Sequence, residues 1–250
     1  MSNRRLTGFV MDDYRSLITE LTEYGYTPCR LQDVRANQPD LYLRHDVDLS
    51  LEMAAEMAVV EAELGVLSTY FVLVSTDIYN PATIQNRRIL SSIIECGHEI
   101  GLHFDVTRVE DGDIDDAAER ECSILSSLTG HPVDTISFHR PARNLLNSTG
   151  RFAGRRHTYE PEFFSKIAYI SDSNGGWHHG HPLDHPAITA RTAVQLLTHP
   201  IWWAGQGVRE TVPLIREYVA VHNGRSDDAI AGTITAYATW RAAQNGAKVK

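Results

Sequence analysis

The chain has 250 residues, of which 42% are hydrophobic and 22% charged, a composition typical of a globular protein rather than a disordered one. Its formal net charge of -9 argues against a nucleic-acid partner, because phosphate binding needs a concentrated basic surface. The first residues contain no apolar run of signal-peptide length, and no stretch approaches the roughly 18 apolar residues of a membrane helix. We therefore expect a cytoplasmic protein without a membrane span.

Helix-like and strand-like segments alternate along the chain, and no Pro-, Gly- or Ser-rich linker interrupts them, so we expect one domain over residues 1–250. Such alternation predicts a parallel sheet with helices packed outside it. The long irregular stretch 144–166 is expected to shape substrate choice. The expected helices are 11–24, 51–64, 83–96, 114–128, 208–221 and 227–244, and the expected strands are 41–43, 68–74, 99–102, 133–138, 167–170 and 194–197.

Polar residues follow five of the predicted strands, and such strand ends form the active-site face of parallel α/β folds. After strand 41–43 come Asp46 and Asp48. Residues two apart in a strand point the same way, so both carboxylates can enter one pocket. One can bind a metal while the other stays free as a base, and a cation or an arginine nearby would remove their mutual repulsion.

Two further strand ends carry nitrogen ligands. His103 follows strand 99–102, with Asp105 two residues on. Neutral imidazole is a common zinc ligand, and a nearby carboxylate can orient it. His139 follows the next strand and can supply another metal nitrogen, while the adjacent Arg140 can pair with a catalytic carboxylate.

The last two strand ends indicate substrate-binding and acid groups. Residues 171–179 form a polar, Gly-rich loop that contains Asp172 and Trp177, and an apolar sugar face can stack on an exposed indole. His199 follows the last strand, ahead of Trp202. A histidine at this place can donate a proton to a leaving amine.

Each of these residues also has a purely structural interpretation. Asp46 or Asp48 can cap the next helix, because Asp is a favoured N-cap residue. His103 and His199 can be packed core histidines, and Arg140 can belong to a basic loop. Five such signals at successive strand ends nevertheless favour one shared site.

Taken in order from Leu41 to Trp203, these residues resemble the polysaccharide deacetylase family, also called the NodB-homology or carbohydrate esterase family 4 group. The resemblance implies a distorted (β/α)7 barrel with a divalent metal at the strand C-termini, zinc first, with cobalt and nickel as alternatives. The segments that carry the resemblance are Asp46-Val47-Asp48, Gly97-His98-Glu99-Ile100-Gly101-Leu102-His103, Arg140-Pro141, Asp172 with Trp177, and Leu197-Thr198-His199.

The resemblance also implies roles for single residues. Asp46 looks like the catalytic base and Asp48 like a metal ligand, and His103 falls at the position of the first histidine ligand. Arg140 would orient the base, and His199 would be the general acid. The substrate-binding candidates are Asp172, Trp177 and Trp202.

One position departs from the family pattern. The usual second metal histidine lies four residues after the first, and here that position is Thr107. A metal held by Asp48 and His103 alone would bind poorly. We predict that His139 restores an Asp-His-His ligand set, with Asp105 and His98 as weaker substitutes.

The implied reaction is hydrolysis of the N-acetyl group of an amino sugar, releasing acetate. The expected cytoplasmic location points to a small saccharide or oligosaccharide precursor of a surface polysaccharide. Two alternatives stay open: another metal-dependent C–N hydrolase on the same barrel, and a non-catalytic saccharide-binding relic. Retention of Asp46, Arg140 and His199 argues against the relic, because a binder needs no base, orienting arginine and acid.

Overall fold

The computed structural model describes residues 9–109, 113–178, 180–205 and 210–247. The chain divides into two compact units, Met1–Gly207 and Val208–Lys250, and each is described by itself. The single domain expected over residues 1–250 stays a prediction. Among the described residues, no helix is both long enough and apolar enough to cross a membrane.

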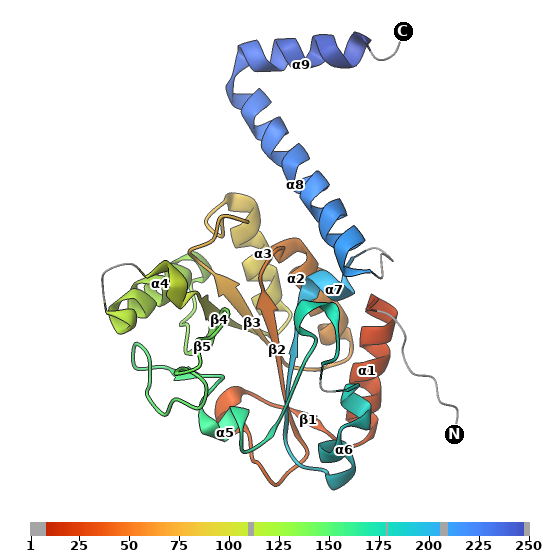
Figure 1. Ribbon diagram of the computed structural model, residues 1–250, viewed down its shortest axis with the longest axis vertical. Coiled ribbons are helices and arrows are strands. Elements are labelled where there is room, and N and C mark those ends of the chain that lie inside the picture. Colours follow the sequence, from red (N-terminus) through yellow and green to blue (C-terminus); the bar gives the residue numbers. More distant parts are fainter. Residues whose placement is uncertain (1–8, 110–112, 179, 206–209, 248–250) are drawn as a thin grey trace. The chain divides into compact units, whose positions relative to one another are not determined.

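A parallel sheet forms the centre of the first unit (Figure 1). Seven strands follow the order β6-β5-β4-β3-β2-β8-β7, and β1 pairs with β2 beside this path. The predicted distorted (β/α)7 barrel is confirmed as a curled parallel sheet whose edge strands, in the described part of the chain, are β6 and β7. The strands are β1 Thr27–Pro28, β2 Asp40–Val47, β3 Thr69–Leu73, β4 Glu99–Phe104, β5 Thr135–Phe138, β6 Arg156–His157, β7 Ala168–Ser171 and β8 Val194–Thr198.

The four longer helices of this unit begin and end within two residues of their predicted bounds. Three begin at a side-chain cap: the Ser50 hydroxyl accepts from the Met53 amide at 3.3 Å, and the Thr83 hydroxyl accepts from the Asn86 amide at 3.1 Å. At the third, the Asp113 carboxylate accepts from the Asp115 amide at 2.8 Å. Three unpredicted short helices each begin at a proline, which suits the first helical position. The helices are α1 Met11–Glu23, α2 Leu51–Glu63, α3 Ile84–Glu95, α4 Ile114–Thr129, α5 Pro161–Phe164, α6 Pro186–Ala190 and α7 Pro200–Trp203, with the 3-10 turns η1 Leu31–Asp33, η2 Val106–Arg108, η3 Ser173–Gly175 and η4 Pro182–Asp184.

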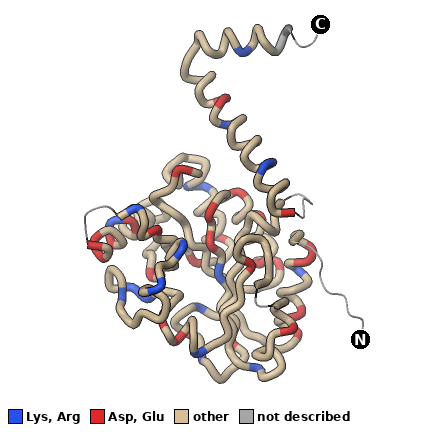
Figure 2. Tube along the Cα trace, viewed as in Figure 1, with Lys and Arg blue, Asp and Glu red and all other residues tan. Residues whose placement is uncertain are grey.

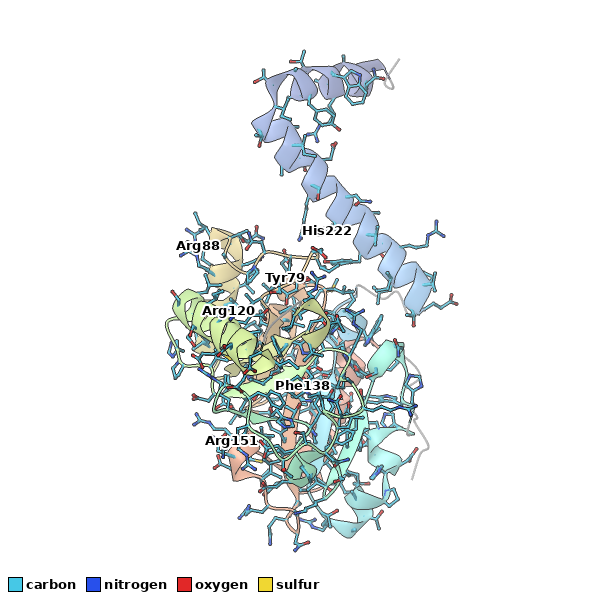
Figure 3. All side chains as sticks on the ribbon, turned by 60° about the vertical axis from the view of Figure 1, so that its left-hand side comes forward. Tyr79, Arg88, Arg120, Phe138, Arg151 and His222 are labelled. Carbon is cyan, nitrogen blue, oxygen red and sulfur yellow. The ribbon has the colours of Figure 1, made fainter. Side chains whose placement is uncertain are left out.

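Two hydrophobic clusters lie on opposite faces of the sheet. The larger joins the outer face to the helices and includes Leu43 of β2 and Phe138 of β5, which is labelled in Figure 3. The smaller, inside the curl, contains Tyr42 and Phe71. A Cβ on Gly101 would lie only 2.4 Å from the Phe71 ring, so glycine is needed there for the ring to fill the interior. Alternation along β2 therefore places Leu43 on the outer face and Tyr42 on the inner one.

The second unit consists of α8 Thr211–Thr233 and α9 Thr235–Ala247. The predicted helices were 208–221 and 227–244, and residues 208 and 209 lie outside the described residues. The expected break after residue 221 was wrong, because α8 continues through Gly224. A glycine costs a helix about 1 kcal/mol relative to alanine but does not end it.

Charged residues are mixed over the first unit. Figure 2 shows its Lys and Arg positions dispersed among Asp and Glu positions. The net charge of the whole chain is -9. The expected absence of a nucleic-acid partner stays a prediction.

Candidate metal centre and active site

The C-terminal ends of the strands surround a cavity of about 240 Å³. Alternation along β2, β4, β5 and β8 turns every second side chain inward, so residues from distant parts of the chain meet there. Its lining residues include Asp46, Asp48, His103, His139, Arg140, Tyr159, Tyr169, His199 and Trp202. All three predicted catalytic residues and all three predicted metal ligands thus lie around one cavity.

Asp48, His103 and His139 offer three ligand atoms that lie within 4.8 Å of one another. Asp48 Oδ1 is 3.1 Å from His103 Nε2 and 3.2 Å from His139 Nδ1. The two ring nitrogens are 3.1 Å apart. One carboxylate and two imidazoles are donors that zinc and related divalent ions accept. The structure therefore brings together the Asp-His-His set predicted from the sequence.

The hydrogen-bond partners of His103 test whether this set fits a cation. His103 Nδ1 lies 3.1 Å from the carbonyl oxygen of Ser137, which can only accept, so Nδ1 carries a hydrogen. Nε2 faces Asp48 at 3.1 Å, where it donates to the carboxylate when protonated and can ligate a cation when deprotonated. Burial alone would raise the pKa of Asp48, but hydrogen bonds from His103 and His139 hold it well below its usual range. Burial opposes the charged form of His103, yet Asp46 and Asp48 raise its pKa. The carboxylates of Asp46 and Asp48 therefore favour a positive charge beside them, and a divalent cation would supply it.

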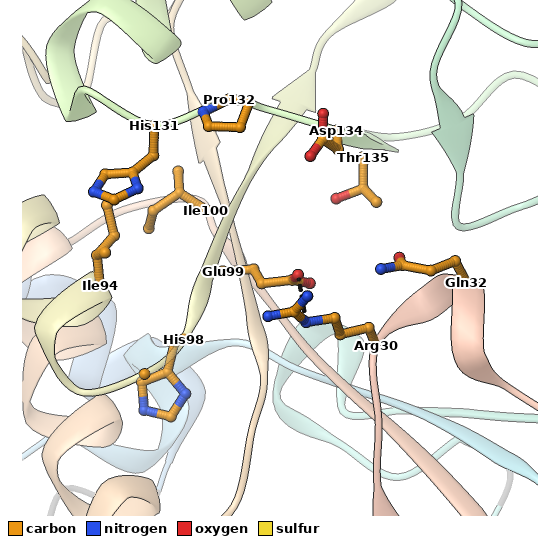
Figure 4. Close-up of a pocket in the computed structure, with 11 residues that line it drawn as sticks. Arg30, Gln32, Ile94, His98, Glu99, Ile100, His131, Pro132, Asp134 and Thr135 are labelled. Atoms are coloured by element: carbon orange, nitrogen blue, oxygen red, sulfur yellow. Dashed lines mark ion pairs between the residues drawn. The ribbon is translucent and has the colours of Figure 1, made fainter.

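The two weaker substitute ligands lie elsewhere. Asp105 accepts hydrogen bonds from Thr107 Oγ1 at 2.6 Å and from Arg140 Nη2 at 2.9 Å, so it orders the loop after β4. His98 lines a different cavity, of about 380 Å³, at the opposite ends of the strands (Figure 4). There its two ring nitrogens contact the Ser68 hydroxyl and the Ala58 carbonyl, each at 3.0 Å.

Asp46 is paired with Arg44 rather than with Arg140. Arg44 Nη1 lies 3.5 Å from Asp46 Oδ1, whereas the side chain of Arg140, 68% exposed, pairs with Asp105 at the rim. The predicted orienting role of Arg140 is therefore corrected. Arg140 lies two residues beyond the end of β5 and has a left-handed φ of 48°, so the backbone turns away from the strand direction there.

Arg44 fills the interior directly beneath Asp46. It is wholly buried, donates to the Ser137 hydroxyl and to the Thr158 hydroxyl at 2.7 Å, and contacts the Tyr159 hydroxyl at 3.2 Å. Its guanidinium carbon lies 5.0 Å from the centre of the Tyr159 ring, at cation–π distance. These contacts compensate for burying the charge and give Asp46 a fixed counter-charge.

His199 is held by Asp172. The Nδ1 atom lies 2.6 Å from Asp172 Oδ1, and the His199 amide donates to Oδ2 at 3.0 Å. Trp203 Nε1, which the sequence analysis missed, donates to the same oxygen at 2.7 Å. Burial favours the neutral ring, but Asp172, Asp48 and Asp46 raise the pKa of His199 to about 9. Nε2 remains directed toward the cluster, 3.9 Å from Asp48 Oδ2.

Two of the three predicted substrate-binding residues are therefore corrected. Asp172 is wholly buried and occupied by the three donors just described, so it cannot contact a ligand. Trp177 packs on Phe9 and Trp203, with ring centroids 5.7 Å and 5.9 Å apart, and lies outside the lining of the cavity. Trp202 lines the cavity, and its substrate-binding role stays a prediction. Tyr159 and Tyr169, which sequence reasoning missed, line the same cavity.

No protein-family model and no curated protein matches this sequence. Solved structures resemble it at low identity. A family 4 carbohydrate esterase from Bacillus anthracis is 17% identical over 83% of this chain and 86% of its own, with a TM-score of 0.41. A peptidoglycan N-acetylglucosamine deacetylase is 15% identical over 83% and 91%, with a TM-score of 0.41. A family 4 acetyl xylan esterase from Clostridium thermocellum, in complex with a cobalt ion, is 12% identical over 74% and 84%, with a TM-score of 0.39.

The first unit is a curled, parallel α/β barrel with an Asp-His-His cluster at the C-terminal ends of its strands. In its fold, the chain is a distant structural match, at low identity, to carbohydrate esterases of family 4.

Proposed function

We propose that this protein is a metal-dependent hydrolase that removes the N-acetyl group from an amino sugar. The observation that carries the proposal is the convergence of Asp48, His103 and His139 beside a carboxylate, Asp46, and an imidazole, His199. A ligand set alone would suit a structural metal site. A base and an acid on either side of it suit hydrolysis.

A divalent cation, when bound by the three ligands, would act as a Lewis acid toward the acyl carbonyl. The protein's own groups move the protons. The Asp46 carboxylate accepts a proton from the attacking water, and Arg44, 3.5 Å away, gives that carboxylate a buried counter-charge. Ser137 Oγ donates to Asp46 at 3.3 Å and helps to fix its orientation.

His199 supplies the proton that the departing amine requires. Asp172 occupies Nδ1, so the proton on Nε2 faces the cavity. Against the effect of burial, the charge and hydrogen bond of Asp172 raise the pKa of His199, which favours the protonated ring that a general acid needs before the C–N bond breaks. The products are acetate and a free amino sugar.

The aromatic residues around the cavity support a saccharide substrate. Tyr159, Tyr169 and Trp202 come from three separate segments and line the same space as the Asp-His-His cluster. Aromatic rings offer stacking surfaces to the apolar faces of sugars. We further propose a cytoplasmic substrate, a saccharide or oligosaccharide precursor of a surface polysaccharide, with zinc as the metal.

The first experiment measures metal content by elemental analysis in the wild type, His103→Ala, His139→Ala and the matched control His131→Ala. His131 is an exposed histidine in the cavity at the opposite strand ends. We expect about one ion per chain in the wild type and the control, and its loss in both ligand variants. Acetate release from N-acetyl amino sugars should be retained in the variants that keep the metal and lost in those that lose it.

Two outcomes would contradict the proposal. A wild type that takes up no zinc, cobalt or nickel would favour a saccharide-binding protein without a metal. Full metal and full activity in His139→Ala would remove His139 from the ligand set.

A further inference from the structure

A second cluster of buried polar side chains lies on the outer face of β2, behind the cavity. Its centre is Glu61 of α2, which is wholly buried. Oε1 accepts from His45 Nε2 at 2.8 Å and from the Tyr14 hydroxyl. Oε2 accepts from the hydroxyls of Ser68 and Tyr70, each at 2.7 Å. Burying a carboxylate is unfavourable unless its lone pairs are bonded, and here four donors bond them.

His45 extends this cluster to the strand that carries the proposed acid. It lies between Arg44 and Asp46 in sequence, and it is the cross-strand partner of Thr198 in the last residue pair of the β2–β8 ladder. Its Nδ1 lies 2.7 Å from Thr198 Oγ1. A hydroxyl can donate to the neutral ring or accept from the protonated one, so the link persists in both states. Asp46 and His199 are the next residues after the two linked positions.

A second route leads from Glu61 to the same histidine. The ring of Tyr14, which donates to Glu61, packs on Trp203 with centroids 5.2 Å apart. Trp203 donates to Asp172, which holds His199 Nδ1 at 2.6 Å. The Glu61 cluster is therefore linked to the strand that carries Asp46 and also to Asp172, which holds His199.

We propose that the Glu61–His45–Thr198 chain is a positioning device, which fixes the distance between Asp46 and His199 by joining β2 to β8 behind them. An apolar contact would hold α2 on the sheet without removing a carboxylate from water. A directional bond across the last residue pair instead fixes two strand ends whose side chains must meet one substrate. A misplacement of about 1 Å in such a pair can cost about a hundredfold in rate. This inference rests on the proposed function.

The test compares Thr198→Val with Ser68→Ala. Each substitution removes one buried hydroxyl of the cluster, but Ser68 bonds Glu61 without linking β2 to β8. We expect a similar fall in Tm for the two variants and unchanged metal content. Only Thr198→Val should lose kcat for acetate release, by about tenfold, with KM within twofold of wild type. An equal loss of kcat in both variants, or none in Thr198→Val, would overturn the proposal.

A second measurement keeps this test separate from the identity of the substrate. The His199 amide donates to Asp172, so its hydrogen exchange reports whether the end of β8 stays in place. We expect faster exchange of this amide in Thr198→Val than in Ser68→Ala, relative to core amides of the same protein. Equal exchange would refute the positioning role. Faster exchange in a protein that releases no acetate would refute the proposed reaction alone.

Discussion

The two faces of β2 carry similar polar side chains, but the hydrogen-bonding groups of these side chains are paired to different extents. On the inner face, Arg44 keeps a buried Nε that has no hydrogen-bond partner among the described residues, and Nε2 of His103 faces only the clustered ligands Asp48 and His139 at 3.1 Å. On the outer face, every lone pair of Glu61 has a donor, and His45 is bonded at both nitrogens. Incomplete bonding around an open cavity indicates a place for ligands, whereas complete bonding indicates a structural support.

Among the variants considered, the one that removes the base should have the largest effect on kcat. We expect Asp46→Asn to lower kcat by about a thousandfold, because a positioned base contributes about 10² to 10⁴ to such a rate. Metal content should stay at the wild-type level, since Asp46 is not among the three clustered ligands. Steady-state kinetics and elemental analysis on the same preparation check both statements. Turnover within tenfold of wild type would exclude Asp46 as the base.

Two arginine variants sharpen the contrast between the buried interior and the rim. Arg44→Lys keeps the charge but cannot reach Asp46, Ser137 and Thr158 together, so we expect a loss of about a hundredfold in kcat through misplacement of Asp46. Arg140→Lys keeps a cation at an exposed position beside Asp105 and should stay within about threefold. The reverse order of effects would restore the role first predicted for Arg140.

The sequence was sufficient to predict what depends on local periodicity. Two-residue alternation predicted that Asp46 in β2 and Asp48 just beyond its end face one cavity, and the rule for strand C-termini predicted His103 and His139 beside them. The same alternation places Arg44 two residues before Asp46, so its inward direction was available from the sequence and was missed.

Contacts between distant segments were not predictable in the same way. Arg44 meets Ser137 across 93 positions of sequence, and Asp172 meets Trp203 across 31. Such pairs depend on how far each strand is shifted against its neighbour, which side-chain patterning does not specify. Trp177 was misplaced for a related reason: an indole beside glycines can bind a sugar or pack on other aromatic rings, and only the fold decides.

On the outer face, Glu61→Gln should cost stability without affecting the metal. The amide keeps the size of the carboxylate but replaces one acceptor by a donor that faces donor groups, so we expect a loss of about 1 to 3 kcal/mol in the free energy of unfolding. The matched control is Glu63→Gln on the same helix, where an exposed pair with Arg15 should contribute less than about 1 kcal/mol. Urea unfolding measures both, and equal effects would contradict the contrast between the faces.

The smallest effect is the pH dependence of that stability difference. Burial alone would raise the pKa of Glu61, but the charge and hydrogen bond of His45, with the charge of His98 and the Ser68 hydroxyl, lower it to about 2, below its ordinary value of 4.5. A depressed carboxyl pKa stabilises the fold above the unfolded-state value, and the contribution is lost as pH falls toward the folded-state value. The stability advantage of the wild type over Glu61→Gln should therefore shrink as pH falls from 4.5 to 2. Urea unfolding of both proteins at several pH values checks this, and an advantage that grows as pH falls would show that Glu61 is buried in its neutral form.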